Sequence, residues 1–261
     1  MQHFDSGGVD IAYLDQGEGP PVLLIHGFAS TAKINWVEPG WVDTLVRAGR
    51  RAIALDNRGH GESGKPHDPA AYTLDNMAGD ARRLLDRLGI ATADVMGYSM
   101  GARIAARLAM REPARVTALI LGGLAGSLFA GQTNQNEIAA ALEARSIGDV
   151  RGDIGFAFRD FAERTRSDLK ALAACMRSET MRIDPEELAA LPMPILVAVG
   201  TRDSMAGPID AVAEKIPNAE LLAIPNRDHM NAVGDRVYKE GVLAFLARHR
   251  PLSVPRKRAE I

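Results

Sequence analysis

The sequence predicts an α/β fold in which helices cover both faces of a mostly parallel sheet of eight strands, with one helical insertion. Three observations support this prediction. Largely apolar runs at residues 21–26, 51–56 and 195–199 are typical of strands buried on both faces of a parallel sheet. Amphipathic helical patterns alternate with such runs, and repeated β then α units place helices on both sides of a sheet. Residues 122–136 are rich in Gly, Ser, Asn and Gln, and residues 137–191 show only helical signals, which indicates the insertion.

The expected elements follow in order from these patterns. The first two strands form an antiparallel hairpin about Gly7 and Gly8. Thr73 can cap a helix whose apolar residues follow helical spacing, and Gly89 stands just past its end. The expected strands are residues 2–5, 9–15, 21–26, 51–56, 93–96, 116–121, 195–199 and 220–224. Outside the insertion, the expected helices are residues 42–48, 73–88, 102–109, 210–216 and 235–248.

Composition narrows the class of protein. With 261 residues, of which 46% are hydrophobic and 25% charged, the chain can bury a substantial core in one main domain. The net charge of −2, from 31 basic and 33 acidic residues, gives no reason to expect a nucleic acid partner. Cys175 is the only cysteine, so an intrachain disulfide is excluded, and we expect this residue to be buried in a helix.

The sequence predicts neither a membrane-spanning protein nor a protein with a metal or another cofactor. The first residues lack a basic segment followed by an apolar one, and no uncharged apolar run approaches the roughly 18 residues of a membrane span. We therefore expect a cytoplasmic protein without a membrane span. Histidines and acids show no H-E-x-x-H or similar ligand spacing, so neither a metal nor another cofactor is expected. The sequence leaves the oligomeric state open.

Residues 97–101 read Gly-Tyr-Ser-Met-Gly and stand between an expected strand and an expected helix. Such a sharp turn strains the backbone of Ser99 and requires neighbours with little or no side chain, which Gly97 and Gly101 provide. The strain holds the Ser99 hydroxyl where a substrate can reach it. The pattern alone also fits a tight turn with an incidental serine, but its position between strand and helix favours a nucleophile.

A serine nucleophile needs a base to accept its proton and a third group to orient that base. In parallel sheets, reacting groups gather at the carboxyl ends of the strands. Asp203 follows the strand at residues 195–199, and His229 follows the strand at residues 220–224. We therefore expect Ser99 as nucleophile, His229 as base and Asp203 as the group that orients it.

Other histidines and acids fit these roles less well. His26 and His60 adjoin glycines at strand ends, which fits hydrogen bonding within a tight loop as well as catalysis. Asp228 is adjacent to the expected base, and successive side chains usually point apart. Asp56 ends a strand too, but Arg58 is its natural partner. Asp203 is therefore the best candidate for the orienting acid.

The order of Ser99, Asp203 and His229 along the chain resembles that of the α/β-hydrolase fold family, whose nucleophile, acid and histidine follow one another in this order. The resemblance covers nearly the whole chain. It implies a core formed by residues 1–121 and 192–261, with residues 122–191 in the place of the family's helical cap. The terminal residues 251–261, which include Arg-Lys-Arg, are expected to be a solvated tail.

Three further motifs support the resemblance. His26-Gly27-Phe28 looks like the family's motif after its third strand, which implies that the backbone N–H groups of Phe28 and Met100 form an oxyanion hole. Residues 56–63 are similar to the family's D-x-R-G-x-G-x-S loop, which is usually regarded as structural. Residues 200–203 look like its G-x-x-D acid turn. The core motifs show no departure from the family.

The resemblance implies a serine hydrolase that forms an acyl-enzyme, and our first hypothesis is an esterase for small to medium, mainly apolar acyl groups. The phenylalanines of the insertion either line its pocket or pack the insertion onto the sheet. The expected pocket residues, besides Phe28 and Met100, are Trp36, Phe129, Phe156, Phe158, Met205 and Met230.

Other activities of the family stay open. A C–C bond or enol-lactone hydrolase of aromatic breakdown acts on substrates that carry carboxylates, so it needs a cation in the pocket, for which Lys33, Arg58 and Arg159 are candidates. A cofactor-free perhydrolase and a hydrolase-fold ligand receptor without turnover are further alternatives. Haloalkane dehalogenases and epoxide hydrolases use a carboxylate as nucleophile, so Ser99 argues against both. The expected partner is a small-molecule ester or lactone.

Overall fold

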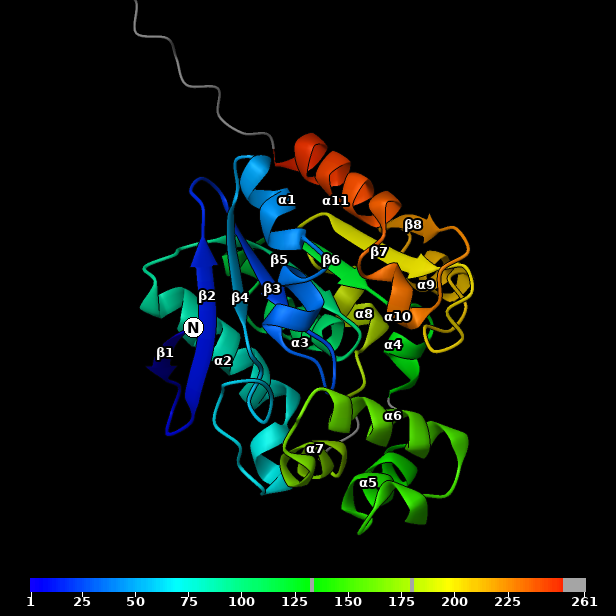
Figure 1. The fold of residues 1–261 in the computed structure, drawn as a ribbon. Coiled ribbons are helices and arrows are strands. Elements are labelled where there is room, and N and C mark those ends of the chain that lie inside the picture. The colour runs from blue at the N-terminus through cyan, green and yellow to red at the C-terminus, as the bar shows by residue number, and fades with distance from the viewer. Residues whose placement is uncertain (132–133, 179–180, 251–261) are drawn as a thin grey trace, which may run out of the picture.

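One eight-stranded sheet organises the chain in the computed structural model, which describes residues 1–131, 134–178 and 181–250 (Figure 1). The strands lie in the order β1-β2-β4-β3-β5-β6-β7-β8. The β1–β2 and β2–β4 pairs are antiparallel, and the other five pairs are parallel. The strands are β1 (Gln2–Asp5), β2 (Asp10–Gln16), β3 (Pro21–Ile25), β4 (Arg51–Leu55), β5 (Ala93–Tyr98), β6 (Val116–Gly122), β7 (Ile195–Gly200) and β8 (Glu220–Ile224). The predicted mostly parallel sheet is confirmed.

Alternate residues of the central strands enter two apolar cores, one on each face of the sheet. In β3, Leu23 and Ile25 belong to one core, and Val22 and Leu24 belong to the other. Helices α2 and α3 cover the first face, and α1 and α11 cover the second (Figure 1). Burial on both faces explains why these strands are continuously apolar. The core helices are α1 (Trp41–Arg47), α2 (Leu74–Arg87), α3 (Met100–Arg111), α9 (Asp210–Lys215), α10 (His229–Ala232) and α11 (Arg236–His249).

Local capping sets several helix ends as the sequence predicts. The Thr73 side chain accepts a hydrogen bond from the Asn76 N–H at the start of α2, and Gly89 has φ of 65° just beyond its end. Short helical turns escaped the sequence patterns, because one turn carries little periodicity. They are a π-helical turn at Lys33–Val37, 3₁₀ turns at Pro69–Tyr72, Pro113–Arg115 and Ile147–Asp149, and the four-residue α10.

Between β6 and β7 the described residues form helices and no strand. These helices are α4 (Ser127–Ala130), α5 (Gln135–Glu143), α6 (Asp153–Arg164), α7 (Leu169–Met176) and α8 (Pro185–Ala189). We call α5, α6 and α7 the inserted helices. They pack on one another at one end of the molecule, whereas α8 packs against α3 and α9 (Figure 1). Cys175 of α7 is fully buried, as expected, 3.9 Å from the Met100 sulfur, and burial raises the pKa of its thiol to about 12.

Across residues 1–131, 134–178 and 181–250, no helix combines the length and the apolar character that crossing a membrane requires. The expected solvated tail, residues 251–261, lies outside the described residues.

Candidate active site

The turn between β5 and α3 holds Ser99 in a strained conformation, with φ of 55° and ψ of −119°. Both flanking glycines are sterically required. A Cβ on Gly97 would lie 2.1 Å from the Gly101 carbonyl oxygen, and a Cβ on Gly101 would lie 2.0 Å from the Ile25 carbonyl oxygen. A hydrogen bond of 2.8 Å from the Ser99 N–H to the Gly122 carbonyl oxygen fixes the turn to β6. Close packing of backbone thus presents the hydroxyl at the carboxyl end of β5.

Three side chains from three strand ends meet at this hydroxyl. The Nε2 atom of His229 lies 2.9 Å from Ser99 Oγ, and its Nδ1 atom lies 2.8 Å from Asp203 Oδ2. A carboxylate only accepts hydrogen bonds, so Nδ1 carries the proton and Nε2 accepts from the serine hydroxyl. The His229 side chain is 11% exposed and that of Asp203 is fully buried. The geometry is that of a serine, its base and an orienting acid.

The two neighbouring acids have different partners. Asp203 Oδ1 accepts hydrogen bonds of 3.0 Å from the N–H groups of Met205 and Ala206, which leaves Oδ2 for the histidine. Asp228 caps α10 and accepts from the N–H groups of Met230 and Asn231. Each carboxylate is therefore held by the backbone of its own loop, and only Asp203 contacts the imidazole.

A hydrogen bond from Tyr98 fixes the backbone of His229. Its hydroxyl donates a hydrogen bond of 2.6 Å to the backbone carbonyl oxygen of His229, and the two rings lie 5.5 Å apart. The Tyr98 side chain is buried, and burial raises the pKa of its hydroxyl, so the group stays protonated and acts as a donor. Sequence reasoning missed this contact because it joins residues 131 positions apart.

Two backbone N–H groups beside the serine are available to bind an oxyanion. No described residue accepts a hydrogen bond from the N–H of Phe28 or Met100, whereas the Gly27 N–H donates to Asn35 Oδ1. The loop after β3 is tight, since Ala29 has φ of 56°. Unpaired N–H groups that flank a nucleophile are what an oxyanion hole requires.

His26 braces this loop and does not reach the serine. Its Nδ1 donates to the Gly27 carbonyl oxygen at 2.7 Å, and its Nε2 accepts from the Asn57 N–H at 2.9 Å. Asn57 also donates through its side chain to the His26 carbonyl oxygen. Burial lowers the pKa of His26 to about 4, so the ring is neutral. Of the two interpretations of His26 left open by the sequence, the geometry supports local hydrogen bonding.

The model of the α/β-hydrolase fold family matches residues 20–183, more than half of the chain. The chain belongs to this family. It is 30% identical over 270 residues, 95% of this chain and 70% of the relative, to the dihydrolipoyllysine-residue acetyltransferase component of an acetoin cleaving system from Pseudomonas putida. An epoxide hydrolase from Caballeronia sordidicola is 38% identical over 114 residues, 44% of this chain and 34% of the relative. The solved structure of a thermophilic esterase from Thermogutta terrifontis has a TM-score of 0.76 and 25% identity, covering 95% of this chain and all of that one.

The family's D-x-R-G-x-G-x-S loop is rigid in this α/β-hydrolase. Asp56 accepts hydrogen bonds from the N–H groups of Ala32 and Glu62, and a Cβ on Gly61 would lie 1.9 Å from its carboxylate. Arg58 forms two hydrogen bonds of 2.7 Å with Asp80. The expected pairing of Arg58 with Asp56 is therefore wrong: the Asp56 carboxylate is occupied by backbone donors, and the guanidinium pairs instead with α2.

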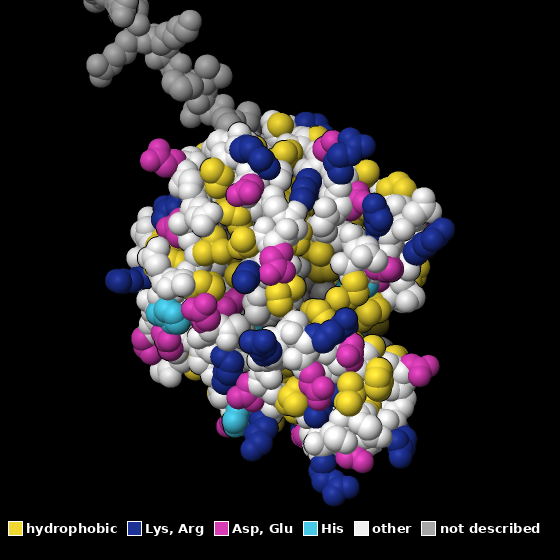
Figure 2. All heavy atoms as spheres, viewed as in Figure 1, with side chains coloured by type: hydrophobic (Ala, Val, Ile, Leu, Met, Phe, Trp, Pro, Cys, Tyr) yellow, Lys and Arg dark blue, Asp and Glu magenta, His cyan; other side chains and the backbone are white. Residues whose placement is uncertain are grey.

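One inserted helix contacts the loop that follows β3 and contains Phe28 and Ala29. The rings of Phe158 in α6 and Phe28 pack edge to face, 5.7 Å apart. The Thr165 hydroxyl, just after α6, lies 3.3 Å from the Ala29 carbonyl oxygen, although the Phe161 carbonyl oxygen, at 2.9 Å, is a nearer acceptor for its proton. Figure 2 shows hydrophobic side chains gathered where the inserted helices meet the core. These contacts place an apolar wall beside the proposed oxyanion hole.

Trp36 belongs to the core and not to a pocket wall. Its side chain is fully buried on the second face of the sheet, where its ring packs 6.2 Å from that of Trp41. The π-helical turn at Lys33–Val37 carries it there, away from the inserted helices. The expectation that Trp36 lines the substrate pocket is therefore wrong.

The remaining pocket candidates differ in exposure. Phe129 is buried, with the Lys215 ammonium 5.9 Å from its ring. Phe156 is 49% exposed, Met205 46% and Met230 58%. The two methionines are close to the acid and the histidine along the chain.

The three candidate cations are engaged elsewhere. Lys33 is on the surface, its side chain 75% exposed, and pairs with Glu38. Arg159 is buried and binds Glu163 together with the carbonyl oxygens of residues 141, 142 and 144. Arg58 is held by Asp80. The two buried arginines are therefore not free to bind the carboxylate of a substrate, and Lys33 lies on the surface.

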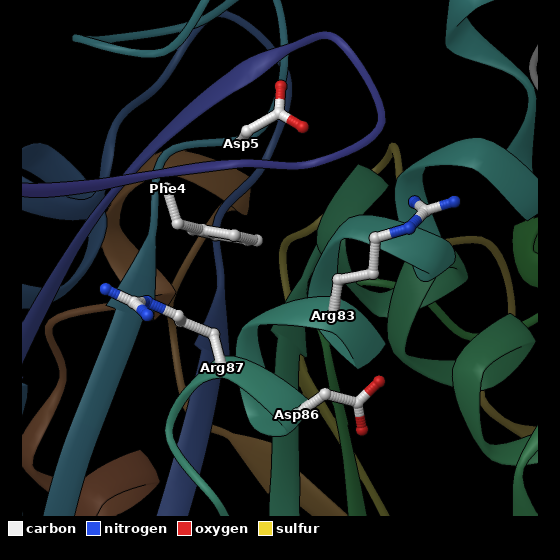
Figure 3. A pocket seen from close by; sticks show the side chains of 5 residues that line it. All are labelled: Phe4, Asp5, Arg83, Asp86 and Arg87. Atoms are coloured by element: carbon white, nitrogen blue, oxygen red, sulfur yellow. The ribbon is translucent and has the colours of Figure 1, made fainter.

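A separate groove of about 440 Å³ lies between β1 and α2 and is lined by Phe4, Asp5, Arg83, Asp86 and Arg87 (Figure 3). The charged ends of Arg83, Asp86 and Arg87 point in different directions, so they form no convergent binding site. Within the described ranges, no group of three histidine, cysteine or acidic side chains is arranged to hold a metal ion.

Proposed function

We propose that this α/β-hydrolase cleaves carboxylic esters of small to medium, mainly apolar acyl groups through an acyl-enzyme at Ser99. The observation that carries the proposal is the continuous contact from Ser99 through His229 to Asp203, at 2.9 and 2.8 Å. The arrangement is suited to proton transfer during nucleophilic attack.

The first half of the reaction forms the acyl-enzyme. As Ser99 Oγ attacks the ester carbonyl carbon, its proton passes to His229 Nε2, and the Asp203 carboxylate stabilises the imidazolium that results. The carbonyl oxygen gains negative charge and accepts hydrogen bonds from the N–H groups of Phe28 and Met100. Loss of one such donor typically costs about 2.7 to 4 kcal/mol of transition-state stabilisation. The imidazolium then returns its proton to the leaving alcohol.

The second half releases the acid. Water takes the place of the alcohol and gives a proton to His229 Nε2 as it attacks the acyl carbon. The same two N–H groups bind the second oxyanion, and the proton returns to Ser99 as the acid leaves. The inserted helices act as a cap over this step, with Phe158 against Phe28 forming part of the acyl site.

The preference for apolar acyl groups rests on the walls of the site. The contact of Phe158 with Phe28 gives the site an aromatic wall, and the candidate cations Arg58 and Arg159 are occupied by buried partners. Substrates of a C–C bond or enol-lactone hydrolase of aromatic breakdown carry carboxylates, which these walls do not match. The likeness to the Thermogutta terrifontis esterase, at 25% identity over nearly the whole chain, also supports an esterase.

An epoxide hydrolase is disfavoured in spite of the relatives that bear this name. Enzymes of that kind in this fold use a carboxylate as the nucleophile, and this chain has Ser99 in that position.

The proposal is tested with p-nitrophenyl esters of acetate, butyrate, octanoate and palmitate. We expect wild-type turnover to be fastest with acetate to octanoate and to be abolished in Ser99→Ala, while circular dichroism and melting temperature show a folded variant. Ser30→Ala is the matched control, since it removes another buried serine hydroxyl of this region. Undiminished activity in Ser99→Ala would refute the assignment, and turnover of epoxides or ring-fission products in place of esters would refute the substrate class.

A further inference from the structure

A buried guanidinium lies one helical turn beyond the nucleophile. Arg103 of α3 is only 3% exposed. Its Nη1 donates to the carbonyl oxygens of Leu128 at 2.9 Å and Met181 at 2.6 Å, and its Nη2 donates to that of Ser127 at 2.6 Å. All three acceptors are backbone atoms.

These acceptors lie on the two segments that join the inserted helices to the sheet. Ser127 and Leu128 are in α4, which precedes the inserted helices, and Met181 follows them. The Ile183 N–H donates to the Leu128 carbonyl oxygen at 3.2 Å, so the outgoing and returning segments are also paired with each other. Arg103 therefore ties both segments to the helix that begins at Ser99.

The same contacts continue to the orienting acid. The Ser127 hydroxyl donates at 2.8 Å, and the Ser127 N–H at 3.1 Å, to the Ala206 carbonyl oxygen. The Ala206 N–H donates to Asp203 Oδ1 at 3.0 Å. A continuous set of hydrogen bonds thus runs from Arg103 through Ser127 and Ala206 to Asp203.

The chemistry of arginine suits this place. Burying a cation is costly, and burial lowers the pKa of the Arg103 guanidinium to about 10, which still leaves it charged at neutral pH. Its planar fork reaches several carbonyl oxygens in fixed directions, whereas a lysine ammonium is a point charge on a flexible stem. An apolar side chain would fill the volume but would leave three buried carbonyls without this donor.

We propose that Arg103 is a positioning residue that fixes both connections of the inserted helices, and the Asp203 loop, relative to Ser99. It thereby governs the turnover rate and the selectivity among acyl chains. This inference rests on the proposed ester hydrolysis at Ser99, but its structural part can be measured without any substrate.

The test compares Arg103→Met, Arg103→Lys and the control Arg107→Met. Arg107 is on the same helix, one turn further on, and its partly buried guanidinium is 3.6 Å from Asp75. Turnover of p-nitrophenyl acetate and octanoate is measured per active site, counted by titration with a fluorophosphonate. We expect kcat per site to fall by about 10²-fold in Arg103→Met, with a changed octanoate-to-acetate ratio, because small displacements of catalytic groups are costly. Arg103→Lys should restore part of the loss.

Hydrogen exchange provides the readout that needs no activity. We expect peptides covering residues 123–131 and 203–208 to exchange faster in Arg103→Met, while β4 stays protected and Arg107→Met matches the wild type. If Arg103→Met does not fold, the same comparison is made with Arg103→Lys. Wild-type exchange in both peptides, or a normal kcat per site with an unchanged ratio, would overturn the proposal. Altered exchange in a protein that no fluorophosphonate labels would instead refute the proposed esterase activity alone.

Discussion

Removing the Tyr98 hydroxyl tests whether its hydrogen bond to the His229 backbone stabilises the fold. In Tyr98→Phe the ring stays in place, but the carbonyl oxygen of His229 loses a donor at 2.6 Å. Tyr98 is 4% exposed, so water cannot readily replace the hydroxyl. The unsatisfied carbonyl should lower the free energy of unfolding by about 2 kcal/mol. For a chain of this size, that corresponds to a melting temperature lower by about 4 to 8 °C.

A nearby tyrosine provides a matched control. Tyr238 is fully buried, its ring lies 6.4 Å from that of Tyr98, and no described residue accepts or donates a hydrogen bond at its hydroxyl. Tyr238→Phe removes an unsatisfied polar atom and should leave stability unchanged or raised. Differential scanning calorimetry of both variants measures the difference. Equal destabilisation by the two substitutions would refute the reasoning, as would an unchanged melting temperature in Tyr98→Phe.

Three further predictions follow from the described contacts. Asp203→Asn should lower kcat by about 10⁴-fold with little change in KM, because the imidazole loses the partner that sets its tautomer, and steady-state kinetics with p-nitrophenyl butyrate measures this. Burial lowers the folded pKa of His26 to about 4 and that of His60 to about 3, against 6.5 when unfolded, so their contribution to stability is present above pH 6.5 and is lost as the pH falls toward 4. Urea unfolding should show a loss of at least about 3 kcal/mol over that range, and a flat profile would contradict the assignment of two buried neutral imidazoles. Gly101→Ala puts a Cβ 2.0 Å from the Ile25 carbonyl oxygen and should cost about 3 kcal/mol, whereas Gly148→Ala, whose Cβ meets nothing closer than 3.6 Å, should be neutral in the same assay.

The convergence of Ser99, Asp203 and His229 could be derived from the sequence because of one property of parallel sheets. Strands β5, β7 and β8 are parallel members of one sheet, so the residues that follow them meet at the same edge. Recognising the strands was enough to bring the three side chains together. The strands could be recognised because a strand that is buried on both faces of the sheet is apolar along its whole length.

The pocket could not be derived in the same way. Trp36 lies in a single π-helical turn, too short to show periodicity, so nothing in the sequence fixed which way its ring faces. Phe156 and Phe158 are two residues apart on α6, and residues at that spacing point to different sides of a helix. One is 49% exposed and the other packs on Phe28, and only the docking of α6 decides between them.

The hydrogen-bond partners of buried arginines were the hardest feature to predict from the sequence. Arg58 had a nearby acid in the sequence, but it pairs with Asp80, 22 residues away. Arg103 belongs to an expected helix and to no motif, and its acceptors are backbone atoms up to 78 residues away. Backbone carbonyls exist at every residue, so no sequence signal distinguishes the three that Arg103 contacts.

The central claim is that Ser99 is the nucleophile, and covalent labelling tests it most directly. The full-length protein is treated with a fluorophosphonate, and intact and peptide masses are recorded. We expect one adduct per chain, located on Ser99, lost in Ser99→Ala and formed much more slowly in His229→Ala. An unlabelled protein that still hydrolyses esters, or an adduct on another residue, would contradict it.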